Sequence, residues 1–218
     1  MSLTKKISDK LAILRRDPMG FMRVMKNVTK ARLGLVPKAP KEGSRFSTDV
    51  EAQALKKYAA GAALGIVEIG VLDGLTTKEM AQVAHVPIYG IDPIIPDSMN
   101  ERLIGHEEKI KQNLAFYKDF HFIKDFSYNA VKGWQQPFDF IFIDGDHRYE
   151  AVKQDLEDWL PLLTSSGFVS FHDSAPVTSI ADAFEGWPGP IRLVMELKGD
   201  NRLEFVGSFD SLSVFRKK

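Results

Sequence analysis

Two carboxylates and an imidazole directly follow a short apolar run in the second half of the chain. The run ends at Ile143, and Asp144, Asp146 and His147 come next. Such an uninterrupted run is typical of a strand buried on both faces of a parallel sheet. Ligands bind beyond the carboxyl ends of these strands, so we expect the three polar side chains to line a reaction site.

A second polar pair, His172 and Asp173, ends the apolar run at residues 167–171. In a parallel sheet this strand is expected beside the previous one, which would bring Asp173 close to Asp144. Oxygen ligands that converge while leaving positions open suit Mg²⁺ or a similar hard ion, which can lower the pKa of a substrate hydroxyl. His172 would shift the preference towards Mn²⁺ as a nitrogen ligand, or it points away and hydrogen-bonds the backbone.

His147 is the candidate general base. Its ordinary pKa near neutrality suits removal of a proton from a hydroxyl group. Asp146 could orient His147 or cap the following helix. The plainer interpretation of the whole group is a set of helix-capping acids and a solvated histidine, because acids are common at such ends.

Three earlier strand ends have residues suited to a nucleoside. The segment Glu68-Ile-Gly-Val-Leu-Asp-Gly74 follows an apolar run, and its glycines would let the backbone approach a ligand closely. Its spacing is not that of the dinucleotide or phosphate-loop motifs, which weakens both interpretations. Asp92 lies about 20 residues beyond the glycine turn, where an acid can accept hydrogen bonds from ribose hydroxyls. Asp125 could pair with an exocyclic amine while the ring of Phe126 packs on the base.

Alternating apolar and amphipathic segments would position these residues. A capping box at Thr48 and Glu51 should start a helix that runs to about residue 60. Further helices are expected at residues 5–14, 21–33, 76–83, 101–116, 128–134, 149–163 and 180–184. Strands are expected at residues 65–70, 88–92, 121–124, 138–144, 167–172, 191–197, 203–206 and 212–215. This order predicts an α/β fold whose mostly parallel sheet has helices on both faces and an antiparallel hairpin at one edge.

The 218 residues carry no net charge, but the charges are unevenly distributed. Residues 1–41 hold 11 Lys or Arg against two acids, which leaves +9 there and −9 on the remainder. We interpret residues 1–43 as a basic helical arm and linker and residues 44–218 as the main domain. The arm could contact nucleic acid or anionic lipid, or it could pack on the acidic body or on a second subunit. The absence of cysteine and of a spanning apolar run is compatible with a cytoplasmic protein.

Together these residues resemble the class I S-adenosylmethionine-dependent methyltransferases, and among them the metal-dependent O-methyltransferases similar to the catechol and macrocin enzymes. The resemblance covers about residues 48–175 and implies a Rossmann-like sheet. It implies that S-adenosylmethionine (SAM) is bound by Glu68, Gly70, Gly74, Thr76, Asp92, Asp125 and Phe126. It also implies that Mg²⁺ or Mn²⁺ is held by Asp144 and Asp173, with His172 as a third candidate ligand. His147 would then be the base. A carboxylate or an asparagine is more usual at His172, which is a departure from the pattern.

The expected activity is therefore methyl transfer to a hydroxyl group of a small molecule or sugar. One alternative is a metal-independent methyltransferase that uses His147 alone. Another is a protein that binds nucleic acid or a membrane surface through its basic arm, although the arm has few aromatic residues to stack on bases. We expect a homo-oligomer formed through the arm, and no nucleic-acid partner.

Overall fold

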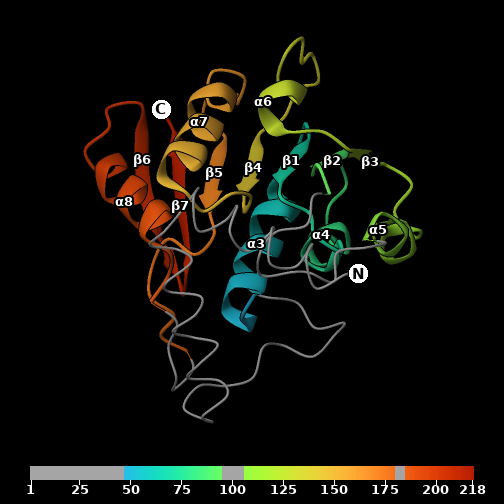
Figure 1. Cartoon of the computed structure of the whole chain (residues 1–218), viewed down its shortest axis with the longest axis horizontal. Coiled ribbons are helices and arrows are strands. Elements are labelled where there is room, and N and C mark those ends of the chain that lie inside the picture. Colours follow the sequence, from blue (N-terminus) through green and yellow to red (C-terminus); the bar gives the residue numbers. More distant parts are fainter. Residues whose placement is uncertain (1–46, 95–105, 180–184) are drawn as a thin grey trace, which may run out of the picture. The chain divides into compact units, whose positions relative to one another are not determined.

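The computed structural model describes residues 47–94, 106–179 and 185–218 (Figure 1). The expected helices at residues 5–14, 21–33 and 180–184 lie outside this part of the chain, as does the proposed domain boundary at residue 43. The described residues belong to one compact unit. No helix within it is long and apolar enough to cross a membrane.

Seven strands form a single sheet with the order β3-β2-β1-β4-β5-β7-β6. The first five strands are parallel, while β7 runs antiparallel to β5 and pairs with β6 as a hairpin. This arrangement confirms the predicted fold class. The strands are β1 (Ile66–Ile69), β2 (Ile88–Ile91), β3 (Phe120–Ile123), β4 (Phe140–Ile143), β5 (Phe168–Phe171), β6 (Leu203–Phe209) and β7 (Leu212–Lys217).

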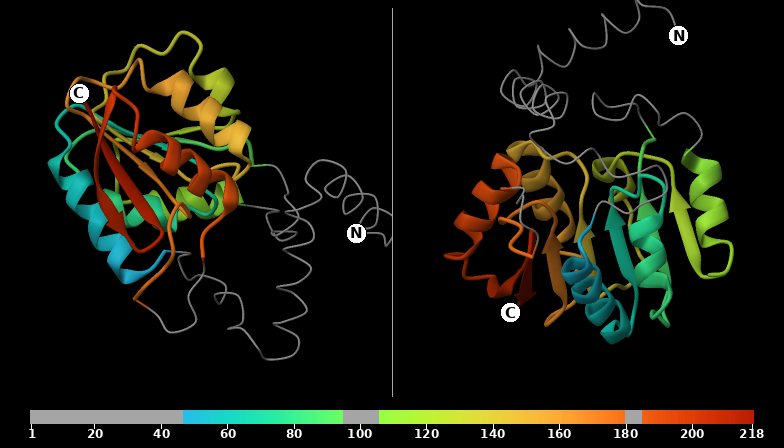
Figure 2. Two further views of the ribbon diagram at one scale, coloured as in Figure 1. Left: turned by 90° about the vertical axis from the view of Figure 1, so that its left-hand side faces the viewer. Right: turned by 90° about the horizontal axis from the view of Figure 1, so that it is seen from below.

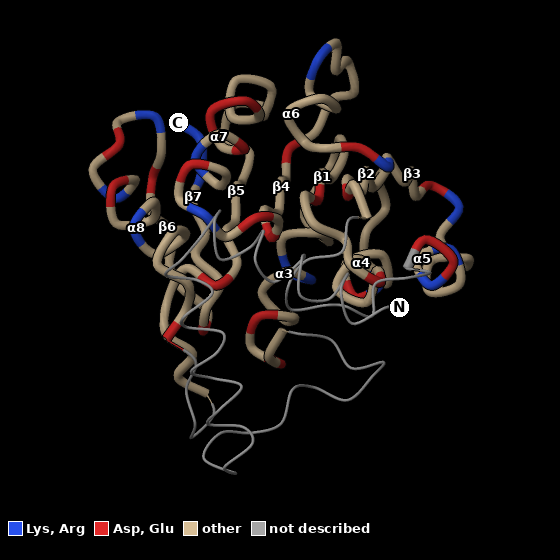
Figure 3. The backbone as a smooth tube through the Cα atoms, viewed as in Figure 1, with Lys and Arg blue, Asp and Glu red and all other residues tan. Residues whose placement is uncertain are grey.

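Helices cover both faces of the sheet (Figure 2). They are α3 (Asp49–Gly61), α4 (Leu75–Ala81), α5 (His106–Leu114), α6 (Ser127–Ala130), α7 (Tyr149–Trp159) and α8 (Pro188–Leu197). One apolar cluster joins the sheet to α7 and α8, and the other joins it to α3, α4 and α5. Acidic and basic residues are interspersed on the outer helix α5 (Figure 3), where Lys111 pairs with Glu107 at 3.0 Å.

The start of α3 has the predicted capping box. The Thr48 hydroxyl accepts the backbone N–H of Glu51, and the Glu51 carboxylate accepts the N–H of Thr48 at 2.7 Å. The Glu51 side chain is only 1% exposed, so this acid lies inside the protein and not at a solvated helix end. Its position brings α3 into contact with the loops at the carboxyl ends of the strands.

One predicted strand is wrong. Residues 191–197 lie in helix α8, which begins with prolines 188 and 190 in its first turn. Proline is well tolerated there because the first backbone N–H groups of a helix have no partner within it. The buried positions Leu193, Val194 and Leu197 follow helical spacing, although Ile191 and Val194 also suit a strand.

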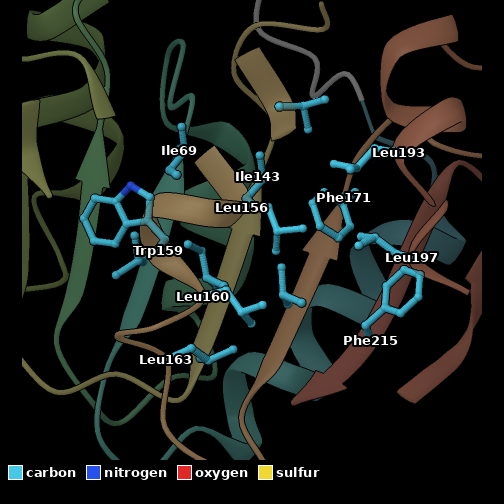
Figure 4. Close-up of a cluster of buried hydrophobic side chains, with 14 of the residues drawn as sticks. Ile69, Ile143, Leu156, Trp159, Leu160, Leu163, Phe171, Leu193, Leu197 and Phe215 are labelled. Carbon is cyan, nitrogen blue, oxygen red and sulfur yellow. The ribbon is translucent and has the colours of Figure 1, made fainter. Parts of the chain in front are cut away.

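The side chain of Trp159 fills the core between α7 and the sheet (Figure 4). It is fully buried, and its ring lies 4.9 Å from that of Trp134 and 5.9 Å from that of Phe138. Trp159→Ala should therefore lower the free energy of unfolding by about 3–5 kcal/mol, measured by urea denaturation. Met195→Ala on the surface of α8, where the residue is 68% exposed, should change it little. Equal losses in the two variants would contradict this assignment of the core.

Candidate active site

The carboxyl ends of β4 and β5 bring Asp144, His147 and Asp173 together. One ligand atom from each lies within 4.8 Å of the others. Nε2 of His147 lies 3.1 Å from Oδ2 of Asp173 and 3.6 Å from Oδ1 of Asp144. Parallel pairing of β4 with β5 explains this convergence, because Ile143 and Phe171 are in register and the next residues leave the sheet together. The sequence predicted these three residues at this edge.

His172 is buried beside this group, with both ring nitrogens near carboxylates. Nδ1 lies 3.1 Å from Oδ1 of Asp144 and 3.4 Å from Oδ1 of Asp173. Nε2 lies 3.4 Å from Oε2 of Glu51. The imidazole thus connects helix α3 to the two strand-end acids. His172 remains a predicted metal ligand, but its ring would have to release one of these contacts to act as one.

Glu51 and Ser211 are the residues of this site that the sequence did not reveal. Oε1 of Glu51 accepts the backbone N–H of Ser211 at 2.9 Å and its hydroxyl at 2.6 Å. The same hydroxyl lies 3.3 Å from Oδ1 of Asp173. The only signal for Glu51 was its place in a capping box, which indicated a helix start and gave no hint of a distant partner.

Asp146 does not orient His147 in this structure. Its carboxylate accepts the backbone N–H of Arg148 at 2.9 Å and the Nε–H of the same residue at 2.7 Å. The ring near His147 is that of Trp187, at a centroid distance of 5.5 Å. Trp187 precedes α8, so one side of His147 is bounded by an aromatic side chain.

Burial and charge act in opposite directions on the ionisable groups. Burial lowers the pKa of His147, but the adjacent Asp144 and Asp173 carboxylates outweigh it and raise the pKa to about 9. Burial would raise the pKa of Asp144, yet the nearby imidazoles of His172 and His147 hold it well below the usual range. The interactions within this cluster therefore favour an ionised Asp144 beside protonated His147 and His172.

Asp92 holds the turn that follows β1. Its Oδ2 accepts the backbone N–H groups of Val71 and Leu72, each at 2.9 Å, and its Oδ1 accepts that of Ile94 at 2.7 Å. Leu72 has a left-handed φ of 55°, a conformation that costs energy for a residue with a branched side chain. The predicted ribose-binding acid thus also fixes the glycine-containing turn, with lone pairs left for a ligand.

The two glycines of the turn have left-handed φ values, 89° at Gly70 and 78° at Gly74. A Cβ atom at Gly70 would collide with the carbonyl oxygen of Asp144, so this glycine permits β1 and β4 to end close together. A Cβ at Gly74 would meet Leu114 of α5 at 3.3 Å. Packing against the backbone therefore requires glycine at residue 70, whereas at residue 74 the left-handed φ favours it more than the available space does.

Glu68 is a fully buried acid below this turn. Neither of its oxygens has a hydrogen bond within the described residues, and the influence of the Thr77 hydroxyl, which lowers the pKa, is outweighed. Burial, together with the charges of Asp144 and Asp92, raises the pKa of Glu68 well above its usual value. The raised pKa favours the protonated, neutral form of Glu68, whereas Asp144, whose pKa is lowered, supplies negative charge at this part of the edge.

The remaining predicted binding residues lie at the next strand end and on α4. Oδ1 of Asp125 accepts the backbone N–H of Phe126 at 2.7 Å and the side-chain amide of Asn129 at 3.1 Å. The Phe126 ring is 38% exposed and stacks on that of Tyr128 at 5.1 Å. Thr76 lies in the first turn of α4. An exposed aromatic face beside a fixed acid is compatible with the predicted contact to a base.

Comparisons with known proteins give the family and the fold. Residues 67–174 match a protein family described as a methyltransferase domain. An uncharacterized protein of Acanthamoeba polyphaga mimivirus is 28% identical over 120 residues, which are 50% of this chain and 51% of that protein. The chain thus spans about half the length of this curated relative.

Two solved structures share the fold. The O-methyltransferase of Bacillus cereus in complex with SAH has a TM-score of 0.58 and 17% identity, with 90% of each chain covered. The O-methyltransferase TomG of Streptomyces achromogenes, involved in tomaymycin synthesis and solved with SAM, has a TM-score of 0.58 and 15% identity. That match covers 79% of this chain and 81% of TomG. At such identities the likeness concerns the fold.

Proposed function

Because the chain belongs to the class I S-adenosylmethionine-dependent methyltransferases, we propose that it methylates a hydroxyl group of a small molecule or sugar with metal assistance. The convergence of Asp144, His147 and Asp173 at the ends of β4 and β5 is the observation that carries this proposal. It supplies two oxygen ligands and a nitrogen base within one small space. The acceptor hydroxyl would enter there, beside Trp187.

The residues of the neighbouring strand ends fit the cofactor. SAM carries a positive sulfonium, and Asp144, whose pKa is lowered, supplies negative charge at this edge. The buried carboxyl of Glu68, whose raised pKa favours its protonated form, offers a hydrogen-bond donor to a polar group of the ligand. Asp92 would accept the ribose hydroxyls with its remaining lone pairs, and Asp125 with Phe126 would contact the adenine. We assign Gly70, Gly74 and Thr76 to the same site because they form the turn and helix start beside Asp92.

The transfer would be an in-line displacement. A lone pair of the acceptor oxygen forms the new bond to the methyl carbon, the carbon–sulfur bond breaks, and the sulfur leaves as neutral S-adenosylhomocysteine (SAH). His147 in its neutral form takes the hydroxyl proton on Nε2, the nitrogen that lies nearest to Asp173, and its raised pKa means that this form is populated at alkaline pH. Because the methyl group is already activated, holding the two reactants in line supplies most of the rate enhancement.

Asp144 and Asp173 fit a hard divalent ion, with His147 close enough to be a further ligand in place of its role as base. Such an ion, when bound, would lower the pKa of the acceptor hydroxyl and stabilise its developing negative charge. His172 and Glu51 would hold the two carboxylates in position.

The metal assignment predicts that Asp173→Asn lowers the affinity for Mn²⁺ by at least about tenfold, measured by titration of the paramagnetic ion. The reason is the loss of one charged ligand from a pair. Asp146→Asn removes a charge from the neighbouring loop, where the side chain pairs with Arg148, and should leave Mn²⁺ affinity unchanged. Equal Mn²⁺ affinity in the wild type and both variants would exclude Asp173 as a ligand.

A metal-independent reaction is the second candidate, favoured by the direct contacts of His147 with two carboxylates. These carboxylates could orient the imidazole without an ion between them. Full activity after exhaustive chelation would support this candidate. The rate should then rise with pH up to about 9, because the raised pKa keeps the base protonated at lower pH.

Calorimetric titration with SAH, with and without Mg²⁺ or Mn²⁺, tests the proposal as a whole. Binding in the micromolar range would support the cofactor site, and a change in affinity with the ion would support metal assistance. Absence of binding under every condition would exclude the proposed function.

We further propose that the basic arm at residues 1–43 mediates self-association. Sedimentation of the full chain and of a chain lacking residues 1–41 would test this.

A further inference from the structure

Asp155 is a buried acid of α7 that the proposed chemistry does not use. Its residue is 7% exposed, and one carboxylate oxygen accepts a short hydrogen bond from the hydroxyl of Ser127 at the start of α6. Ser127 follows Asp125 and Phe126 directly, so the bond fixes the far side of the turn that carries these two residues. A residue 28 positions away along the chain thus helps to fix this turn, in addition to the local hydrogen bonds of Asp125.

The groups that face Asp155 give it little electrostatic support. Among the described residues, the charged groups that act on it are Asp146 in the loop after β4 and Asp158 on α7, and neither is a cation. Asp146 is itself paired with Arg148. Burial, with a smaller effect of the two acids, raises the pKa of Asp155 to about 6, although the Ser127 hydroxyl opposes this. At neutral pH the Asp155 carboxylate is therefore charged at a buried position, where a neutral side chain would destabilise the folded protein less.

The loop after β4 limits how Asp155 could move. A Cβ atom at Gly145 would lie 3.9 Å from the second carboxylate oxygen, so this side chain stands between the loop of Asp144 and the turn of Phe126. Both segments belong to the proposed site. Residues that lower the stability of a folded protein are often found at its binding sites. Replacing them with stabilising residues tends to reduce function.

We propose that Asp155 is a positioning residue for the cofactor, which holds the Asp125–Ser127 turn in the conformation that receives the adenine ring. This inference rests on the proposed function, since it takes SAM as the ligand and Phe126 as its adenine contact. Asp155 acts through Ser127 and does not need to touch the ligand. Loosening the bond should weaken binding of SAH because the turn must then be ordered when the ligand arrives.

The test compares SAH affinity in Asp155→Ala, Asp155→Asn and Ser127→Ala by calorimetry at pH 7.5. Asp155→Ala and Ser127→Ala should each lower the affinity about tenfold, which is the effect expected for one hydrogen bond to a charged group. The double variant should be no weaker than either single one, because both changes remove the same bond. Asp155→Asn keeps an acceptor oxygen and should recover part of the loss.

Measuring the stability of the variants distinguishes a positioning role of Asp155 from a merely structural one. The raised pKa of Asp155 gives a contribution to stability that is present below the unfolded value near 4 and is lost as pH rises through about 6. Asp155→Asn should therefore raise the melting temperature by about 5 °C at pH 8 while it weakens SAH binding. Wild-type affinity for SAH should fall between pH 7.5 and pH 5, and this change should be absent in Asp155→Asn.

Asp158→Asn is the matched control, because it removes a charge from the same helix without contact to Ser127. Its affinity for SAH should equal that of the wild type. Tight SAH binding by the wild type with unchanged affinity in Asp155→Ala and Ser127→Ala would overturn this inference alone. Failure of the wild type to bind SAH would overturn the proposed function and this inference together.

Discussion

Replacing His147 by alanine is expected to lower the turnover of methyl transfer about 10²–10⁴-fold while leaving SAH affinity unchanged. The neutral imidazole would be the basic group beside Asp144 and Asp173, so its loss would remove the proton acceptor and not the cofactor site. The measurement is transfer of a labelled methyl group from SAM to a panel of catechols and sugars. SAH calorimetry on the same sample reports whether the binding site is intact.

His121→Ala is a suitable control for this variant. His121 lies on β3 with a half-exposed side chain and pairs with Asp119 at 3.2 Å, outside the group at β4 and β5. It should leave turnover unchanged. If His147→Ala also turned over at the wild-type rate, His147 would have no part in the proton transfer, and the role of the cluster would be restricted to metal binding.

Replacing Asp92 by alanine should reduce SAH affinity at least about 100-fold. Three backbone N–H groups would lose their acceptor, and the turn with its left-handed Leu72 would lose the contact that holds it. A donor left without a partner costs about 1–3 kcal/mol when fully buried, and these three are partly buried, so loss of the ordered turn would account for a large part of the predicted change. The lost contact to ribose adds to it. Calorimetry with SAH measures the effect, and circular dichroism monitors the fold.

Two comparisons make the Asp92 result interpretable. Asp119→Ala removes an exposed acid from the segment before β3 and should bind SAH like the wild type. Asp92→Asn keeps one acceptor oxygen for the turn and should fall between the wild type and Asp92→Ala. Wild-type affinity in Asp92→Ala would mean that neither the turn nor a ribose contact depends on this acid, and the cofactor would have to lie elsewhere.

Most of the sheet could be predicted because its central strands are short apolar runs that stop at glycine or an acid. The runs around Val67, Ile141 and Val169 are buried on both faces, and only a parallel sheet covered by helices accommodates such segments in sequence. Helix α8 was assigned wrongly because Ile191, Leu193 and Val194 suit either structure. Its packing against α7 decided the outcome, and a local sequence pattern does not contain that information.

The site could be predicted where it depends on single strand ends, and not where it depends on distant contacts. Asp144, His147 and Asp173 were found because each lies within a few residues of a buried strand. The contact of Glu51 with His172 spans 121 positions, and that with Ser211 spans 160. No spacing rule connects such residues, since only the folded sheet brings the start of α3 and the β6–β7 turn to the same edge.

That contact also has a consequence for synthesis of the protein. Glu51 lies before the segment that matches the methyltransferase family, and Ser211 lies beyond it, near the end of the chain. Translation must therefore pass residue 211 before the carboxylates at β4 and β5 gain their full support. A chain that ended before residue 211 would contain every strand-end acid but would lack the Ser211 contact of Glu51 and strand β7, which pairs with β5.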